Sequence, residues 1–393
     1  MKKTIVILTA TRAEYGLLKT LIKALITDGT FNIKVVVTAA HLSPEFGMTS
    51  QEIEEDGIKI DRKIETLLSS DTPSSISKCM GLTMIGLADY FAKTKPDAFI
   101  VLGDRYETLA ASCAAFNARI PIIHLYGGET TEGAVDEAYR HAISKMSFLH
   151  LTSTEEYRKR VIQLGEEPSR VFKVGAIGIE NALHTKLLSA KELSESLGIN
   201  LSNNYAFATF HPVTLENNSA EKQIKVLLNT LNNYKNMQFI FSKANADANG
   251  RIINRILDDY CSEHDNFYVF SSLGMTRYLS AVKHAKFVIG NSSSGLVEVP
   301  SFKIPTINIG DRQKGRMMAS SVICCEPTQS DIEKAITKAF SPEFRKIASK
   351  TVNPYGDGKT SMKIIKIIKE MFSKPINLKK KFYDIPFEVK DSK

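Results

Sequence analysis

The chain has 393 residues, and at roughly 100–200 residues per domain this length predicts two or three domains. Hydrophobic residues make up 43% and charged residues 24%, a balance that excludes a mostly disordered chain. The net charge is +8, but nine Lys and only four acidic residues fall between Lys363 and Lys393. The rest of the chain therefore lacks the basic excess of a nucleic-acid-binding protein, and we expect no nucleic-acid partner.

The N-terminal apolar run Ile5–Leu8 is too short for a signal peptide, and Arg12 and Glu14 follow it at once. No stretch approaches the roughly 20 apolar residues of a membrane span. The five cysteines form no CxxC pair and no metal-binding spacing, and an odd number of scattered thiols is typical of a reducing compartment. We therefore expect a cytoplasmic protein with no metal, no cofactor and no membrane partner.

Short β-branched runs alternate with longer amphipathic stretches in the first half. The predicted strands, in order, are Thr4–Leu8, Ile33–Thr38, Ala98–Leu102, Ile120–Leu125 and Leu149–Ser153. The predicted helices are Leu17–Thr27, Pro73–Lys93 and Glu107–Ala118. Nearly all-apolar strands that alternate with helices indicate a parallel sheet covered on both faces.

The same pattern restarts in the second half, after a polar junction at Ala190–Asn204. The predicted strands there are Tyr205–Phe210, Gln238–Phe241, Phe267–Phe270, Phe287–Ile289, Thr306–Ile309 and Val322–Cys325, and Glu221–Tyr234 is a predicted helix. We predict an α/β fold of two Rossmann-like, doubly wound domains with a cleft between them. The expected boundaries are 1–182 and 183–362, with residues 363–393 as a C-terminal helix and basic tail.

Charged side chains follow the predicted strands of the first half. Arg12 follows the first strand, Asp104 the third, and Glu129 the fourth, after two glycines that let the backbone approach a ligand. Ligands of doubly wound sheets bind beyond the carboxyl ends of the strands, so we expect these groups at the cleft. Arg12 would contact an anion or form a surface salt bridge, and Asp104 would face the cleft or cap the next helix.

The segment Asp136–His141 places further charges within two turns of a predicted helix. Glu137, Arg140 and His141 share one face of it, and a solvated charged face is the alternative reading. Carboxylates that gather at one site raise one another's pKa. We therefore expect the strand-end cluster to keep one acid protonated and another ionised at neutral pH.

Polar residues also end the strands of the second half. His211 precedes Pro212, which excludes it from a continuing helix and sets the imidazole at a strand tip, in the site or as a buried structural group. Asn245 lies in the polar run after the next strand.

The strongest local signal is the turn Gly290–Gly295, which contains three successive serines between a strand and a short helix. Backbone amides, hydroxyl groups and the helix dipole converge there, which predicts a cradle for a diphosphate. Glu298 follows on the same side and could accept both hydroxyls of a ribose, whereas the alternative is a serine-rich helix cap with an exposed Glu. Cations of the run Arg312–Arg316 lie near the same rim.

As a set, these segments resemble the hydrolysing UDP-N-acetylglucosamine 2-epimerases of bacterial sialic-acid pathways, over about residues 3–370. The motifs that carry the resemblance are, in order, TRAEYG, HLSPEFG, GDRYE, GGETTEG, DEAYRH, HPVT, GNSSSG and GDRQKGR. The resemblance implies the glycosyltransferase-B architecture, with a C-terminal helix near Thr360–Phe372 that crosses back onto the first domain. Apolar helix faces in the first domain favour a homodimer.

The implied reaction converts UDP-GlcNAc and water into N-acetylmannosamine and UDP, without metal or NAD. Anti elimination of UDP gives a 2-acetamidoglucal, and water then adds at C1 while C2 is reprotonated on the opposite face, which requires acid/base groups and an anion site. Carried over from the family, the catalytic groups are Asp104 and Glu129, with Asp136 or Glu137 as a third and His211 at the leaving phosphate. The implied substrate-binding residues are Arg12, Asn245, Ser292, Ser293, Ser294, Gly295, Glu298 and Arg316.

In the non-hydrolysing branch the strand-end Glu is followed by Ala-Gly-Leu-Arg, whereas here Glu129 is followed by Thr-Thr-Glu-Gly, which favours release of the glycal to water.

Three other functions stay open. A hydrolysing epimerase for UDP-2,4-diacetamido-2,4,6-trideoxyglucose is the close alternative, and the segment His41–Ser75 is expected to decide it. A glycosyltransferase of the same fold and a UDP-sugar-binding regulatory module are the others. The basic tail after Phe372 is expected to be a solvated extension.

Overall fold

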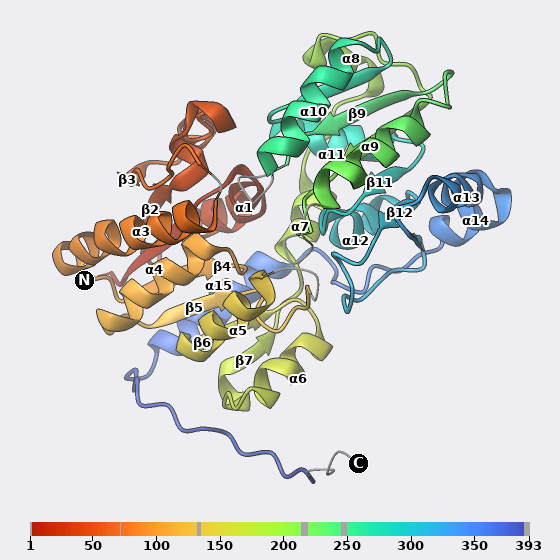
Figure 1. Ribbon diagram of the computed structural model, residues 1–393. Coiled ribbons are helices and arrows are strands. Elements are labelled where there is room, and N and C mark those ends of the chain that lie inside the picture. Colours follow the sequence, from red (N-terminus) through yellow and green to blue (C-terminus); the bar gives the residue numbers. More distant parts are fainter. Residues whose placement is uncertain (1, 71, 132–134, 214–218, 245–249, 389–393) are drawn as a thin grey trace.

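The computed structural model describes residues 2–70, 72–131, 135–213, 219–244 and 250–388. Within these residues the chain forms two parallel β-sheets, one of seven strands and one of six, with helices packed around each. Figure 1 shows the two halves side by side, the first sheet in the red-to-yellow half and the second in the green-to-blue half. The predicted α/β fold with two doubly wound sheets is confirmed.

The first sheet has the strand order β3-β2-β1-β4-β5-β6-β7, and every pair is parallel. Its strands are β1 (Thr4–Thr9), β2 (Asn32–Thr38), β3 (Ile60–Ile64), β4 (Ala98–Leu102), β5 (Ile122–Leu125), β6 (Leu149–Thr152) and β7 (Val171–Lys173). Its helices are α1 (Arg12–Asp28), α2 (Ser50–Glu55), α3 (Pro73–Thr94), α4 (Tyr106–Asn117), α5 (Asp136–Met146), α6 (Glu155–Gln163) and α7 (Ile177–His184).

The second sheet has the order β10-β9-β8-β11-β12-β13, again parallel throughout. Its strands are β8 (Tyr205–Thr209), β9 (Gln238–Ser242), β10 (Phe267–Phe270), β11 (Val288–Gly290), β12 (Thr306–Ile309) and β13 (Val322–Cys325). The helices after α7 are α8 (Ala190–Leu197), α9 (Ser219–Leu231), α10 (Gly250–Ser262), α11 (Gly274–His284), α12 (Ser294–Val297), α13 (Gln329–Phe340), α14 (Pro342–Ser349) and α15 (Thr360–Phe372).

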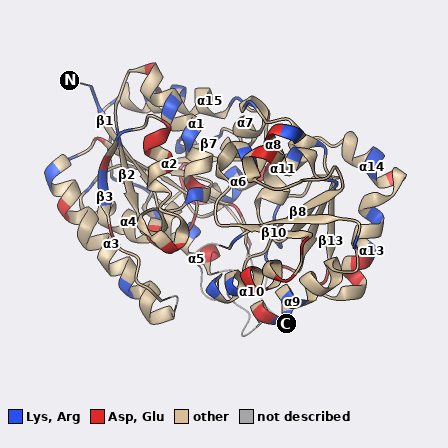
Figure 2. Cartoon of the chain, turned by 90° about the horizontal axis from the view of Figure 1, so that it is seen from above, with Lys and Arg blue, Asp and Glu red and all other residues tan. Residues whose placement is uncertain are grey.

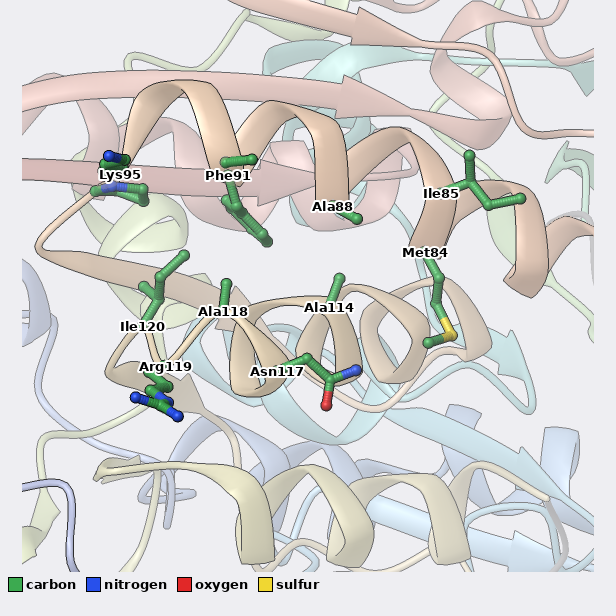
Figure 3. Close-up of a pocket in the computed structure, with 12 residues that line it drawn as sticks. Met84, Ile85, Ala88, Phe91, Lys95, Ala114, Asn117, Ala118, Arg119 and Ile120 are labelled. Atoms are coloured by element: carbon green, nitrogen blue, oxygen red, sulfur yellow. The ribbon is translucent and has the colours of Figure 1, made fainter.

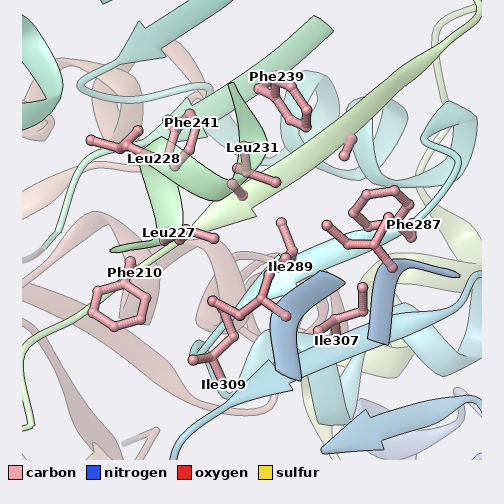
Figure 4. Close-up of a cluster of buried hydrophobic side chains, with 14 of the residues drawn as sticks. Phe210, Leu227, Leu228, Leu231, Phe239, Phe241, Phe287, Ile289, Ile307 and Ile309 are labelled. Atoms are coloured by element: carbon pink, nitrogen blue, oxygen red, sulfur yellow. The ribbon is translucent and has the colours of Figure 1, made fainter. Parts of the chain in front are cut away.

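Each sheet buries both faces, as the nearly continuous apolar strands predict. In β1, Ile5 and Ile7 enter one buried cluster, whereas Val6 and Leu8 enter the cluster on the opposite face, because successive side chains of a strand alternate. In the second sheet, aromatic and aliphatic side chains of the strands pack against α9 and α13, and Figure 4 shows Phe239, Phe241 and Phe287 in this core. Two rigid sheets thus support the loops at their strand ends.

The C-terminal helix α15 returns to the first half. Ile364, Ile365 and Ile368 are buried with the core residues of α1 and the first sheet, and Lys369 pairs with Asp28 at 2.7 Å. The helix α15 therefore packs on α1 and on α7, and Ser361 donates to the buried carboxylate of Glu180 at 2.7 Å.

The segment after α15 differs from the expected solvated extension. Lys380 forms an ion pair with the buried Glu166 at 2.5 Å, and the backbone N–H of Tyr383 donates to the carbonyl of Gly165 at 2.9 Å. The tail is thus attached to the first half, because its basic side chain finds a buried acidic partner that sequence alone does not place near it.

The expected polar junction Ala190–Asn204 is also corrected in part, because α8 occupies its first eight residues. Ser189 and Glu192 form a capping box, Gly198 ends the helix with a φ of +67, and Leu193 is buried in the second half. Figure 2 shows basic and acidic residues interspersed over the helices of both halves. None of the described helices combines the length and the apolar character needed to cross a bilayer.

Candidate active site

Two pairs of strand ends form the candidate site, one pair in each sheet. The strand order reverses between β1 and β4 in the first sheet and between β8 and β11 in the second. Loops that leave such a pair diverge and leave room for a ligand at the carboxyl ends. Arg12 and Asp104 follow β1 and β4, and His211 and Ser292 follow β8 and β11, so the predicted residues lie at both of these points.

Arg140 on α5 connects the acidic groups of the first half. Its side chain is only 1% exposed, and it donates hydrogen bonds to side-chain oxygens of Asp104, Thr131 and Glu137 and to the backbone carbonyl of Glu129. The donor–acceptor distances are 2.7 Å to the Glu129 carbonyl and 2.5 Å to Glu137. One guanidinium thereby holds together the loop after β4, the loop after β5 and the first turn of α5.

The charge of Arg140 lowers the pKa of the neighbouring carboxyl groups, whereas the sequence predicted that these pKa values are raised. Burial by itself raises the pKa of Asp104, but the charges of Arg140 and Arg316 bring that pKa below its usual value. Burial likewise opposes ionisation of Glu137, but hydrogen bonds from His141 and the charge of Arg140 lower its pKa to about 2. The expectation that these carboxylates raise one another's pKa is therefore wrong for Asp104 and Glu137, and both are ionised at neutral pH.

Glu129 is held between the two halves of the molecule. Its side chain is 3% exposed, Oε1 accepts a hydrogen bond from the Ser153 hydroxyl at 2.8 Å, and Oε2 lies 3.1 Å from Nη1 of Arg316. Arg316 also donates to the carbonyl of Thr130 at 2.9 Å. Burial by itself disfavours the charged form of Arg316, but the nearby charge of Glu129 raises the pKa of Arg316 above its usual value. An acidic group of the first half thus has its counter-ion in the second.

The paired glycines before Glu129 make room for protein atoms. Gly128 has a φ of +78, and a Cβ at this position would lie 2.3 Å from the carbonyl oxygen of Tyr157. A Cβ on Gly127 would lie 3.0 Å from the hydroxyl of Ser144. The two glycines let the loop pack closely on α5 and α6, whereas the sequence interpretation assigned the space to a ligand.

His124 on β5 fixes the turn that leads to Asp104. Its Nε2 lies 2.7 Å from the carbonyl of Gly103, which can only accept, so Nε2 carries the proton. Nδ1 then accepts from the hydroxyl of Ser144 on α5 at 3.2 Å. Burial lowers the pKa of His124 to about 3, so the ring is neutral and acts as a fixed link between β4, β5 and α5.

In the second half, His211 is joined to the neighbouring strand end by reciprocal hydrogen bonds. Its backbone N–H donates to Oδ1 of Asn291 at 2.7 Å, and Nδ2 of Asn291 donates to its carbonyl at 2.8 Å. The side chain of Gln313 donates to the carbonyl of Asn291 at 2.8 Å. His211 is buried, and these contacts hold it beside the turn that begins at Ser292.

The three serines connect β11 to α12, which is a single helical turn. The amide of Ser294 donates to the hydroxyl of Ser292 at 3.4 Å, and the hydroxyl of Ser294 contacts the phenol of Tyr278. Ser293 is the residue that precedes α12. Because α12 is so short, an anion bound here would depend on individual amides and hydroxyls more than on a helix dipole.

Glu298 is buried, so the alternative of an exposed Glu after a serine cap is wrong. Its carboxylate packs on α7, because a Cβ on Gly178 would lie 1.9 Å from its Oε1. Burial raises the pKa of Glu298 to about 7, although a hydrogen bond with Ser294 opposes the shift. Its Oε2 has no hydrogen-bond partner among the described residues. A buried acceptor of this kind is typical of a site that binds hydroxyl groups.

Arg12 crosses from the first half to the second. Its guanidinium donates to the carbonyl of Lys243 at 2.6 Å and to the carbonyl of Ser271. Burial lowers its pKa to about 10. These two carbonyls follow β9 and β10 directly. Arg12 is therefore held by backbone carbonyls of the second half and not by the surface salt bridge that was the alternative expectation.

The structure places most of the remaining predicted residues. Asp136 begins α5, next to Glu137, so it lies at the same end of the helix as the acidic cluster. Gly295 lies inside α12, where a Cβ would be 2.9 Å from the side chain of Thr306. Asn245 lies outside the described residues. Asp104 does not cap the next helix, because Arg105 occupies the cap position.

The sequence reasoning missed the residues that join the site together. Arg140 was placed on the same helix face as Glu137, but its pairing with Asp104 joins two loops far apart in the sequence. Ser153 was recognised only as the end of a predicted strand, because nothing near it in the sequence indicates a contact with Glu129. The described residues contain no group of three His, Cys, Asp or Glu side chains arranged to hold a metal ion.

Comparison with known proteins gives one consistent result. The family model for UDP-N-acetylglucosamine 2-epimerase matches residues 23–369. A Campylobacter jejuni protein named GDP/UDP-N,N'-diacetylbacillosamine 2-epimerase (hydrolyzing) is 45% identical over 345 residues, which cover 88% of this chain and 89% of that protein. Polysialic acid biosynthesis protein P7 of Escherichia coli is 40% identical over 385 residues, 98% of both chains. The fold is that of a Neisseria meningitidis UDP-GlcNAc 2-epimerase solved with UDP-GlcNAc, with a TM-score of 0.78, 20% identity and coverage of 93% of this chain and 100% of that one.

Proposed function

Because the chain belongs to the hydrolysing UDP-N-acetylglucosamine 2-epimerase family, we propose that it converts UDP-GlcNAc and water into N-acetylmannosamine and UDP. One observation carries the proposal: the ion pair between Glu129 and Arg316 joins the acidic cluster of the first half to the second half, which holds the serine turn. A sugar nucleotide bound across the two halves would then have its pyranose near Asp104 and Glu129 and its diphosphate near Ser292–Ser294.

The acidic groups would move protons at C2 of the sugar. The C2 proton is not acidic by itself, but departure of UDP from C1 builds positive charge on the ring and weakens the C2–H bond. Asp104 is ionised at neutral pH, so it can take this proton while the C1–O bond breaks and a C1=C2 bond forms. Water then adds its oxygen to C1, and C2 receives a proton on the opposite face, with Glu129 and either Asp136 or Glu137 as the remaining acid/base groups.

The second half would hold the nucleotide. His211 would stabilise or protonate the leaving phosphate, and the hydroxyls and amides of Ser292–Ser294 would bind the diphosphate, with Arg12 at its side. The buried Oε2 of Glu298 would accept hydroxyl groups of the ribose, which supplies the partner that it lacks among the described residues. No step of this scheme requires a metal ion or NAD.

The test is an NMR time course with UDP-GlcNAc in deuterium oxide. We expect UDP, free N-acetylmannosamine and one deuterium at C2, because C2 loses its proton and gains one from solvent. Product without deuterium at C2 would exclude elimination. Transfer of the sugar to an added acceptor would indicate a glycosyltransferase, and binding of UDP-GlcNAc without release of UDP would indicate a regulatory module.

UDP-2,4-diacetamido-2,4,6-trideoxyglucose is the second candidate substrate, supported by the name of the 45% identical relative. A small pocket lies between the segment His41–Ser75, α3, the start of α4 and α10. Its lining includes Phe46, Leu67, Ile76 and Tyr106, with Arg251 of α10 at one side. Such a lining suits the methyl group of a 6-deoxy sugar or of a 4-acetamido group better than a hydroxyl. The NMR assay with both sugar nucleotides in parallel separates the candidates by their relative kcat/KM.

The physiological setting follows from this activity. Free N-acetylmannosamine is a precursor for nonulosonic (sialic) acid biosynthesis, which we propose as the pathway. The five cysteines are all free, which supports a cytoplasmic location.

We also propose a homodimer that forms through α3 and α4. Figure 3 shows a groove between these helices, lined by Met84, Ile85, Phe91 and Ala114 among others. Ile85 is 65% exposed and Phe116 on α4 is 55% exposed, so the outer surface of the two helices is unusually apolar. Analytical ultracentrifugation of Ile85→Glu against the wild-type chain tests the proposal, because a charge at the interface should yield monomers.

A further inference from the structure

Within the part of the tail that the structure describes, residues Lys380–Tyr383 attach it to the first half. Figure 1 shows it as an extended blue trace that leaves α15. The ammonium group of Lys380 contacts Glu166 at 2.5 Å and donates to the backbone carbonyls of Lys145 at 2.9 Å and Ser147 at 2.7 Å. Lys380 is thus the only one of the three consecutive lysines 379–381 with a side-chain contact to the folded body among the described residues.

Two neighbours of Lys380 support this contact. The ring of Phe382 lies over Gly165, where a Cβ would be 2.3 Å from the ring, and the ammonium group of Lys145 lies 5.1 Å from the centre of the same ring. The backbone N–H of Tyr383 donates to the carbonyl of Gly165 at 2.9 Å. Gly165 has a φ of +84, so the position is suited to glycine on both counts. The segment Lys380–Tyr383 is therefore a specific attachment, which we call the tail clamp.

The partner of the clamp is a buried carboxylate. Glu166 is 1% exposed and accepts contacts from Lys145 at 2.7 Å, His150 at 3.0 Å and Lys380. Burial alone disfavours its charge, and these three partners together lower its pKa to about 2. A buried charge of this kind requires its partners, so Lys380 is part of a cluster whose members depend on one another.

The clamp lies at one end of α5, and the candidate active site lies at the other. Lys145 lies in the last turn of α5 and Ser147 is its C-terminal cap, where a cation satisfies free carbonyl groups and interacts favourably with the helix dipole. Glu137 and Arg140 project from the first half of the same helix. At 1.5 Å per residue, α5 is only about 16 Å long, so a shift of its C-terminal end moves the guanidinium of Arg140 as well.

A second connection runs through the sheet. His150, which contacts Glu166, lies on β6 opposite His124 on β5. His124 in turn bonds the carbonyl of Gly103, the residue before Asp104. The clamp is therefore packed against both supports of the acidic cluster, α5 and the β5–β6 pair.

We propose that the tail clamp is a positioning device for catalysis, in which Lys380 acts through α5 to hold Arg140, Asp104 and Glu137 in their reactive arrangement. This inference rests on the proposed function for its kinetic readout. Lys380 touches neither substrate nor reacting atoms in this proposal, so it is a positioning residue. Apart from Arg12, the residues proposed to bind UDP belong to the second half, so UDP binding should not depend on Lys380.

The experiment compares Lys380→Gln with Lys380→Arg and with the matched control Lys381→Gln, whose side chain is exposed in the same tail. Lys380→Gln should lower kcat between about 10-fold and 100-fold, the range expected for a small misplacement of catalytic groups, with the Kd for UDP unchanged by calorimetry. Lys380→Arg should restore most of the activity, and Lys381→Gln should match the wild type. Amide hydrogen exchange of residues 136–146 should be faster in Lys380→Gln alone.

Two results would overturn the proposal. One is a folded Lys380→Gln protein with wild-type kcat and wild-type exchange in α5. The other is a general loss of structure, seen as weaker UDP binding and faster exchange in both sheets, which would make Lys380 a merely structural residue. If the wild-type chain releases no UDP, the proposed function fails, but the exchange comparison still decides whether the clamp orders α5.

Discussion

Replacement of Arg140 by Met tests how the acidic cluster is held together. Met preserves much of the side-chain volume but removes four hydrogen bonds and the only charge that contacts both Asp104 and Glu137 within the described residues. The fall in the pKa of Glu137 from 4.5 to about 2 corresponds to roughly 3 kcal/mol of folding free energy, shared among His141, Arg140 and the amide of Thr131. Because Asp104 also loses its ion pair with Arg140, we expect the free energy of unfolding to fall by about 3–5 kcal/mol at pH 7.5.

The loss should depend on pH in a defined way. A carboxyl group whose pKa is lowered by folding contributes stability above its unfolded pKa, and this contribution disappears as the pH falls toward the folded value. The difference in the free energy of unfolding between wild type and Arg140→Met should therefore be constant above about pH 5. It should become smaller below pH 4.5, as the carboxyl groups are protonated. Urea unfolding followed by circular dichroism at pH 7.5, 5.5 and 3.5 measures it.

The control for this experiment is Lys225→Met. Lys225 pairs with Glu221 on an exposed face of α9, so its removal should leave the urea midpoint nearly unchanged. Equal urea midpoints for Arg140→Met and wild type at pH 7.5 would refute the central role of Arg140. If the free energy of unfolding of Arg140→Met is lower than that of the wild type by the same amount at pH 3.5 as at pH 7.5, the destabilisation comes from packing and not from the paired carboxylates.

Three further predictions concern the two strand-end regions. Asp104→Asn and Glu129→Gln should each lower kcat by about 100-fold or more with little change in the Kd for UDP, and near-normal turnover of both would remove their acid/base roles. Because burial raises the pKa of Glu298 to about 7, UDP affinity measured by calorimetry should increase between pH 6 and pH 8 as the carboxylate ionises, and Glu298→Gln should bind more weakly and lose this part of the pH dependence. Gly290→Ala should lower the melting temperature strongly, because Gly290 has a φ of +137 and a Cβ there would lie 1.9 Å from the carbonyl of Thr209; an unchanged melting temperature would contradict the described turn.

The sequence predicts the sheets well where strands are buried on both faces. Apolar runs such as Ala98–Leu102 and Thr306–Ile309 match β4 and β12 residue for residue. The edge strand β3 was missed, because its sequence IDRKI is polar and its side chains are largely exposed. Strand β7 was missed because three residues carry too little pattern.

The candidate site is predictable at the level of loops but not of contacts. Strand-end positions of Asp104, Glu129 and His211 follow from the parallel topology, which brings carboxyl ends to one edge. The pairings of Arg140 with Asp104 and of Arg316 with Glu129 join residues 36 and 187 positions apart, and no local pattern encodes them. The expected rise in pKa was therefore wrong for Asp104 and Glu137, since their ionisation depends on these cations and not on the number of carboxylates.

The contacts of Arg12 and Arg316 have a consequence for turnover. Both side chains start in one half and end on the other. Under the proposed function, a separation of the halves would break these contacts and remove the counter-ion of Glu129. The two arginines would therefore couple the approach of the halves to the assembly of the site, so that acid/base chemistry and closure around the sugar nucleotide occur together.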